Sequence, residues 1–366
     1  MYIALFFLTY SFVLGFVIVN KMYIKTSSMA TVMALGIITQ GVISNYFGSN
    51  NIEEYTKTLC TINLALWMAF ATSYLISCTK RKFTEIHLNN PINRFGIGTW
   101  IAGTSICGIL VHRQFLELAI VSQILLFINF VFWLMYIGVC FVALRDISRQ
   151  NLKKEVHGVI FLTTVSTQSI VLLMNTVYNE VPKWVNVSMI TMGICFYVIA
   201  AYLIMDRYLR NFNSFSIKDD WKNTNCIIHG ATSITGLACL FSSSINHQII
   251  IFIWFFTLII FLSVELIETI RLISRIKSYG VSKGILIYDV SQWSRVFTFG
   301  MFYTFTFIVA TNINMQNRVQ NFIVETGIWV IFILGISELL LSIKVQFENF
   351  RLRKLNKPKP IEYESL

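Results

Sequence analysis

Long apolar runs separated by short polar connections fill almost the whole sequence. Runs long enough to cross a bilayer as helices lie at about 28–47, 57–78, 95–112, 116–144, 157–178, 184–208, 223–243, 247–274, 292–312 and 321–347. Backbone groups in lipid must be hydrogen-bonded internally, so we expect helices rather than open strands. The pattern predicts an all-α integral membrane protein with a ten-helix domain at 28–347.

A further apolar run occupies residues 1–20. It has neither the positive flank nor the small-residue cleavage site of a signal peptide. We therefore expect an additional N-terminal transmembrane segment, or an upstream extension if translation starts at Met22.

Composition supports the membrane assignment and argues against enzyme chemistry. The chain has 366 residues, of which 55% are hydrophobic and 13% charged, and its mean hydropathy is +0.66. The seven cysteines and five histidines are scattered without zinc or disulfide spacing. The motifs of serine hydrolases, phosphate-binding loops and zinc proteases do not occur. We expect no catalytic residue, no metal and no cofactor, and the protein is not predicted to be an enzyme.

Basic residues alternate between the two sides of the predicted membrane domain. All but four of the 29 lysines and arginines fall in one set of loops, and the exceptions are Lys57, Arg113, Lys183 and Arg318. This is the positive-inside pattern, so the net charge of +11 reflects topology and does not indicate a nucleic-acid partner. It places the C-terminus, with a polar tail at 348–366, in the cytoplasm. If the segment 1–20 spans the membrane, its N-terminus lies outside.

The odd-numbered helices of the ten differ in composition from the even-numbered ones. The odd helices begin at intervals of roughly 65 residues, and they are rich in Gly, Ala, Ser and Thr; examples are 96–105, 163–169, 229–236 and 293–312. The even helices, such as 116–142 and 249–262, are bulky and apolar. Small residues in membrane helices commonly serve close helix packing. Five at a regular period favour an inner ring around a shared axis, with the even helices facing lipid.

Four motifs in these odd helices resemble those of the tellurite-resistance/dicarboxylate transporter (TDT) family, which includes the plant guard-cell slow anion channels. The motifs are Met33-Ala-Leu-Gly36-Ile37, Ala102-Gly103-Thr104, Thr167-Gln168-Ser169 and Trp293-Ser-Arg-Val-Phe297-Thr-Phe-Gly300-Met301. They occur in the family's order, and the likeness covers about 28–347, so this part is expected to be a TDT-like transport domain.

The resemblance implies five helical hairpins with pseudo-fivefold symmetry around a central pore, assembled as a homotrimer. It also implies a phenylalanine gate on the ninth helix, for which Phe297 is the first candidate and Phe299 and Phe302 are less favoured. An aromatic side chain packed between helices is the alternative for Phe297. The chain departs from the family in having Thr298 where proline is usual and in carrying the extra N-terminal segment.

On this arrangement, hydroxyl, amide and backbone donors of the inner helices are expected to replace the hydration shell of a passing anion. The N-terminal ends of these helices and the basic loops favour anions at the cytoplasmic mouth. The predicted pore-lining residues are Gly36, Thr99, Gly103, Thr104, Thr167, Gln168, Thr232, Thr235, Gly300 and Thr304.

Acidic and histidine residues within the predicted spans have two interpretations. Glu265 and Glu268 are placed to form local salt bridges with Arg271 and Arg275. His229 and the more isolated Glu338 are candidate proton or anion contacts. The alternative for His229 is a hydrogen-bonded packing role, and for Glu338 it is a carboxylate that is protonated or paired across helices.

The sequence thus predicts a membrane anion channel or permease that passes small anions or carboxylates through a Phe-gated pore, in the cell (plasma or inner) membrane. Its expected partners are small anions, the lipid bilayer and further copies of the chain. Two alternatives remain. One is a proton-coupled C4-dicarboxylate or tellurite-related transporter, and the other is a non-conducting membrane sensor or scaffold.

Overall fold

The computed structural model describes residues 1–19, 23–48, 51–210, 212–313 and 317–354, and no strand occurs among them. Ten of its helices are long and apolar enough to cross a membrane by length and composition. The prediction of an all-helical membrane protein is confirmed. An eleventh long helix, α12 (Gln292–Asn312), has 21 residues and a more polar sequence.

Five helical segments form an inner ring. They are α2 (Ala30–Ile37) with η2 (Ile38–Ile43) and α3 (Ser44–Phe47), α5 (Gly98–Gln114), α7 (Leu162–Val177), α10 (Ile227–Phe241) and α12. In order around the ring, α2 contacts α5, α5 contacts α7, α7 contacts α10, α10 contacts α12, and α12 returns to α2. These are the odd-numbered helices of the sequence prediction, and they surround one axis.

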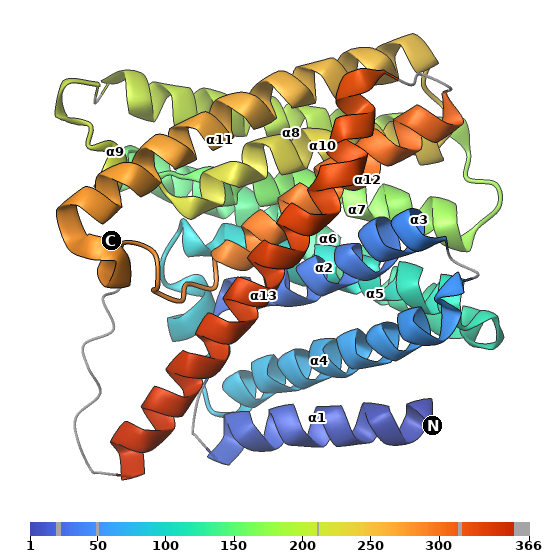
Figure 1. Ribbon diagram of the computed structural model, residues 1–366, viewed down its shortest axis with the longest axis horizontal. Helices are drawn as coiled ribbons and strands as arrows, with labels where there is room; N and C mark the ends of the chain where they lie inside the picture. Colours follow the sequence, from blue (N-terminus) through green and yellow to red (C-terminus); the bar gives the residue numbers. More distant parts are fainter. Residues whose placement is uncertain (20–22, 49–50, 211, 314–316, 355–366) are drawn as a thin grey trace.

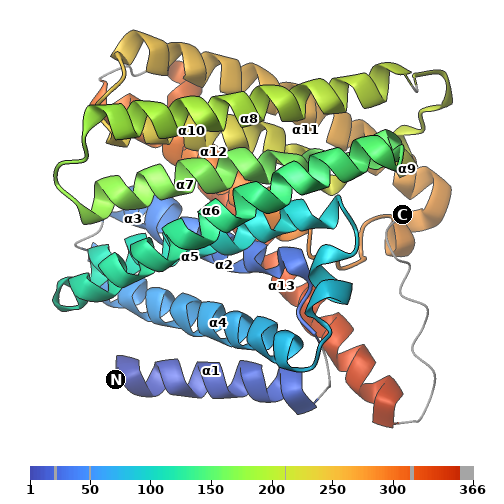
Figure 2. The ribbon, with the colours of Figure 1, turned by 180° about the vertical axis from the view of Figure 1, so that it is seen from behind.

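Five longer helices cover this ring from outside (Figures 1 and 2). They are α4 (Glu53–Thr79), α6 (Ala119–Arg149), α8 (Lys183–Arg210), α11 (His247–Gly284) and α13 (Arg318–Lys354). Each contacts the inner helix before it in the chain and the next one around the ring, with α13 reaching back to η2. Between 72 and 89% of the apolar window is buried in the inner spans of α2, α5, α7 and α10, against 22–44% in the outer spans. Large apolar side chains on the outer helices are therefore left to face lipid.

The helix α1 (Tyr2–Val19) packs on the outside of α4, where both views place it at the edge of the bundle (Figures 1 and 2). The Tyr2 hydroxyl donates to Glu54, and Tyr10 lies 3.2 Å from Thr72 in hydroxyl-to-hydroxyl distance. The first contact lies near the start of both helices and the second lies further along both, so α1 and α4 run parallel. Only 6% of the α1 window is buried, as expected for a helix surrounded mostly by lipid.

Two helices extend further than their hydropathy predicts. α11 continues from the expected end near 274 to Gly284 and turns at Gly280, whose φ is +75°. α13 continues to Lys354, into the expected polar tail, and residues 355–366 lie outside the described part of the chain. Polar residues such as Lys, Ser and Arg can continue a helix beyond the bilayer. A prediction from hydropathy alone therefore ends these two helices too early in the sequence.

The starting ends of the inner helices are packed together very closely. A Cβ on Gly158 would lie 2.0 Å from the Thr224 carbonyl oxygen, and one on Gly98 would lie 2.8 Å from the Leu162 carbonyl oxygen. The Gly158 N–H also donates to Asn225 Oδ1 at 2.8 Å. Glycine thus lets η8 (Gly158–Phe161) meet η10 (Asn223–Cys226), backbone against backbone, at the end where the basic loops lie.

A histidine reinforces this end. His157 Nδ1 lies 2.7 Å from Thr224 Oγ1, which joins the segments that lead into α7 and α10.

Adding one methyl group at this contact tests its tightness. We expect Gly158→Ala to lower the free energy of unfolding by about 1–3 kcal/mol, because the new Cβ overlaps backbone that cannot move without opening the ring. The matched control is Gly138→Ala on α6, where nothing lies within 4 Å of the added Cβ, and its effect should stay within about 0.5 kcal/mol. Thermal unfolding of the purified variants in detergent measures both, and equal melting temperatures would refute the close contact.

Candidate functional site

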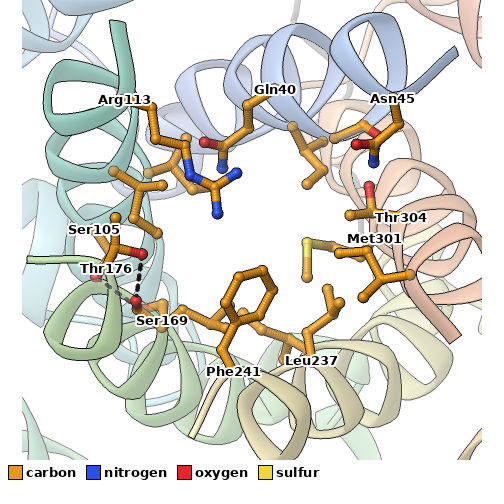
Figure 3. A pocket seen from close by; sticks show the side chains of 17 residues that line it. Gln40, Asn45, Ser105, Arg113, Ser169, Thr176, Leu237, Phe241, Met301 and Thr304 are labelled. Atoms are coloured by element: carbon orange, nitrogen blue, oxygen red, sulfur yellow. Dashed lines mark hydrogen bonds between the residues drawn. The ribbon is translucent and has the colours of Figure 1, made fainter. Parts of the chain in front are cut away.

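A cavity lies on the axis of the inner ring, in the later halves of the five inner helices (Figure 3). The cavity and the open solvent next to it together occupy about 590 Å³. Its lining comes from all five segments, namely residues of 37–45, 105–113, 169–176, 234–241 and 301–308. Because the same late part of each helix lines it, the five helices run in the same direction.

The lining follows one helical face in each segment. In α12 it consists of Met301, Thr304 and Ile308, a spacing of three and then four residues. The same spacing recurs in α10 with Ile234, Leu237 and Phe241. The cavity wall is mostly apolar, with polar side chains at a few positions: Gln40, Asn45, Ser105, Arg113, Ser169, Thr176 and Thr304.

Among the ten predicted pore-lining residues, Thr304 lines this cavity. Two others accept hydrogen bonds from tryptophans of the outer helices: Trp67 Nε1 donates to Thr104 Oγ1 at 2.8 Å, and Trp133 Nε1 donates to Thr167 Oγ1 at 3.0 Å. The Gln168 amide donates to the Ile190 carbonyl of α8 at 3.1 Å. These polar side chains therefore hold the outer ring to the inner ring.

Trp254 Nε1 of α11 makes the corresponding bond to Thr306 Oγ1 of α12, at 3.0 Å. In all three cases an outer helix bonds to the inner helix that follows it in the chain. The repeated indole-to-threonine bond is a feature of the internal repeat that the sequence analysis did not find. Its signal is a tryptophan in an even helix followed by a threonine in the next odd helix.

The predicted glycines lie at contacts between helices. A Cβ on Gly36 would lie 2.1 Å from Ile106 Cγ2, and one on Gly300 would lie 2.7 Å from Ile37 Cγ2. A Cβ on Gly103 would be 3.6 Å from Met29, a normal contact distance. These positions serve the close approach of α2 to α5 and α12.

The remaining predicted hydroxyls bond to backbone. Thr99 donates to the Gly96 carbonyl at 2.8 Å. Thr232 donates to the His229 carbonyl at 2.9 Å, and Thr235 to the Ala231 carbonyl at 2.7 Å. All three side chains are buried.

The three candidate gate residues point to different places. Phe302 stacks on Phe261 of α11 with ring centroids 4.5 Å apart, and Phe299 meets the same ring at 5.1 Å. Both therefore pack toward the outer ring. Phe297 is 1% exposed and lies four residues before Met301, on the face of α12 that lines the cavity.

A buried cluster of charged residues joins α10, α11 and α12 near their basic-loop ends. Arg295 pairs with Glu265, and its Nη1 lies 3.6 Å from Glu268 Oε2. Arg271 Nη1 lies 3.2 Å from the same Glu268 oxygen, as the sequence predicts. The contact between Arg295 and Glu265 was not predicted, because the two residues are thirty positions apart.

The two candidate proton or anion contacts lie away from the cavity lining. His229 is fully buried, with Nε2 3.7 Å from Glu265 Oε1 and its ring against Phe261 and Phe299. Glu338 lies on α13 and is half-buried, and its Oε2 has no hydrogen-bond partner among the described residues. Neither joins the polar residues of the cavity.

The described residues contain no cluster of three or more His, Cys, Asp or Glu side chains that could hold a metal ion. Two cavity residues, Arg113 and Gln40, were not singled out by the sequence analysis. Arg113 is one of the few basic residues on its side of the membrane domain, which is a signal that the sequence already contains.

Comparison with known proteins agrees with this architecture. A search of curated proteins finds no match. A family model described as SLAC1, voltage-dependent anion channel, matches residues 23–340. This range includes all ten helices of the two rings except the end of α13, and it omits α1. The chain therefore belongs to the SLAC1 family of voltage-dependent anion channels.

Proposed function

We propose that the protein is an anion channel or permease whose path follows the axis of the inner ring. The observation that carries the proposal is the cavity on that axis, lined by the same face of five parallel helices. The outer helices shield this axis from lipid, so an anion there meets protein groups and water only. The arrangement supports five hairpins related by pseudo-fivefold symmetry.

Phe297 is the gate in this proposal. The lining of α12 stops at Met301, and the next side chain on the same face toward the helix start is the buried Phe297. The close packing at Gly98 and Gly158 lies on the same side of the cavity. These contacts support a closed state in this proposal, with the path open toward one membrane face and filled at the other.

The orientation follows from charge. The basic loops lie at the filled end, so we place that end and the C-terminus in the cytoplasm. The cavity then opens to the outside of the cell (plasma or inner) membrane. We further propose a homotrimer, with lipid around the outer helices and small anions as the permeating partners.

A second candidate function is proton-coupled transport of a C4-dicarboxylate or a tellurite-related oxyanion. The observation that favours it is the contact of His229 with Glu265 beside Arg295, because buried titratable pairs can carry protons. Both carboxylates of this cluster already have arginine partners. We therefore favour a structural role for the cluster and passive flux through the axis.

Truncating the proposed gate should open the path. We expect Phe297→Ala to raise anion flux into liposomes at least about tenfold. A tenfold rise corresponds to a shift of ~1.4 kcal/mol in the free-energy difference between the closed and open states, in favour of the open state. Phe299→Ala is the matched control, since it removes the same ring from a side chain packed against α11, and its flux should stay near that of the wild type. Unchanged flux in a folded Phe297→Ala protein, judged by its elution as a single species, would eliminate this gate.

Imposed proton gradients separate the two candidate functions. For passive flux, the anion flux driven by a fixed anion gradient should be the same with and without a pH difference, provided that a potassium ionophore clamps the membrane potential. His229→Gln should leave this flux within about twofold, because the residue lies off the axis. A flux that follows the pH gradient, and that His229→Gln uncouples, would establish the coupled transporter instead.

A further inference from the structure

Arg113 brings a positive charge into the cavity. It lies at the end of α5, its side chain is exposed to the cavity, and its guanidinium points toward the centre of the ring (Figure 3). No carboxylate in the described part of the chain lies within 4.0 Å of it. Arginines on the opposite side of the membrane domain, such as Arg94 and Arg295, are paired with acids instead.

An aromatic ring holds the guanidinium in place. The Arg113 Cζ lies 5.6 Å from the centroid of the Phe241 ring, which is itself part of the cavity wall at the end of α10. A cation over a ring face is attracted without using its N–H groups. The contact therefore fixes the guanidinium over the cavity and leaves its donors available for a ligand.

Gln40 supplies a second donor. It lies in the π-helical turn η2, and its amide nitrogen points into the cavity (Figure 3). Its Oε1 is buried without a hydrogen-bond partner among the described residues. A π turn inserts one extra residue per turn and commonly occurs at functional sites. Here it turns Gln40 toward the axis where the neighbouring Gly41 approaches Thr304.

The hydroxyl groups of the cavity are engaged elsewhere. Thr304 donates to the Gly300 carbonyl at 2.7 Å, and Thr176 to the Leu172 carbonyl at 2.8 Å. Ser105 donates to Ser169, which donates to the Ser166 carbonyl. Asn45 uses its amide on the Gly41 carbonyl at 2.7 Å. Among the lining side chains with N–H groups, Asn45 thus has one N–H engaged, whereas Arg113 and Gln40 make no hydrogen bond through theirs within the described part of the chain.

The helix dipoles make a cation necessary at this end. All five inner helices end at the cavity, and the C-terminal end of each carries about half a negative charge. Without a compensating group, this end of the axis would repel anions. Arg113 is the charged residue in the cavity lining, and its positive charge opposes this negative potential where an anion would enter.

We propose that Arg113 and Gln40 form an outward-facing binding site for one small, singly charged anion. The site deepens the proposed channel function and rests on it. One guanidinium balances one negative charge. A second negative charge on the same ligand would meet no second cation in the mostly apolar lining, so its desolvation would be uncompensated.

Equilibrium binding tests the site independently of flux. Nitrate at constant ionic strength, with gluconate as the replacing anion, should raise the melting temperature of the purified wild type in detergent in a saturable manner. Arg113→Gln should weaken the apparent nitrate affinity at least about tenfold, the cost of losing a charged hydrogen-bond donor. Arg113→Lys should retain most of the affinity, which separates charge from misfolding.

Two controls complete the binding experiment. Lys183→Gln removes a positive charge from the same end of the protein, at the exposed start of α8 and away from the cavity lining, and should bind nitrate like the wild type. Gln40→Leu should weaken binding by less than Arg113→Gln, because it removes a neutral donor.

Three results would overturn the site: equal nitrate affinity in wild type and Arg113→Gln, equal losses of affinity in Arg113→Gln and Lys183→Gln, or tighter binding of succinate than of nitrate.

A flux measurement distinguishes failure of the binding site from failure of the proposed channel function. With nitrate supplied only on the outer side, the half-saturating concentration should rise about tenfold in Arg113→Gln. Wild-type protein that binds nitrate but passes no anion would retain the site and refute the channel.

Discussion

The close approach of the five inner helices at their starting ends is the constraint on which the rest of the structure depends. Gly98 and Gly158 bring backbone against backbone there, and no larger residue fits at those distances. Because all five helices run the same way, contact at one end leaves the other end free to splay apart. The cavity among the later halves of the five helices follows from that geometry.

Parallel helices also fix the electrostatics. Their N-terminal ends and the basic loops put positive potential at one membrane face, where anions are favoured without any special residue. Their C-terminal ends create the opposite potential in the cavity, so that face needs its own cation. A fold that aligns five dipoles therefore calls for a group such as Arg113 at the mouth where the helices end. Phe241 holds that charge without neutralising it.

Much of the architecture could be predicted from the sequence, because hydropathy and charge report directly on lipid and on topology. The periodic alternation of hydroxyl-rich and bulky apolar helices was enough to predict which helices form the inner ring and which form the outer ring. The same contrast does not say which individual hydroxyl groups face the axis. Thr104 and Thr167 are acceptors for the outer-ring indoles of Trp67 and Trp133.

The cavity donors were harder to foresee, for physical reasons. A hydroxyl in a helix can donate to the carbonyl four residues back, as Thr304 does, so its presence does not mean that its donor is available. The direction of Gln40 depends on a π turn, which leaves no periodic signal in the sequence. Which face of α12 meets the axis depends on packing against α2 and α11, and this alone separates Phe297 from Phe299 and Phe302.

The most direct test of permeation along the axis is a cysteine placed in the cavity. Thr304→Cys, in a background where the exposed Cys78 and Cys195 are replaced, should react with a membrane-impermeant anionic thiol reagent and lose its anion current in planar bilayers. Ser263→Cys, at an exposed position on α11, should keep its current under the same treatment. Full current after complete modification of Thr304→Cys, verified by mass spectrometry, would contradict the account.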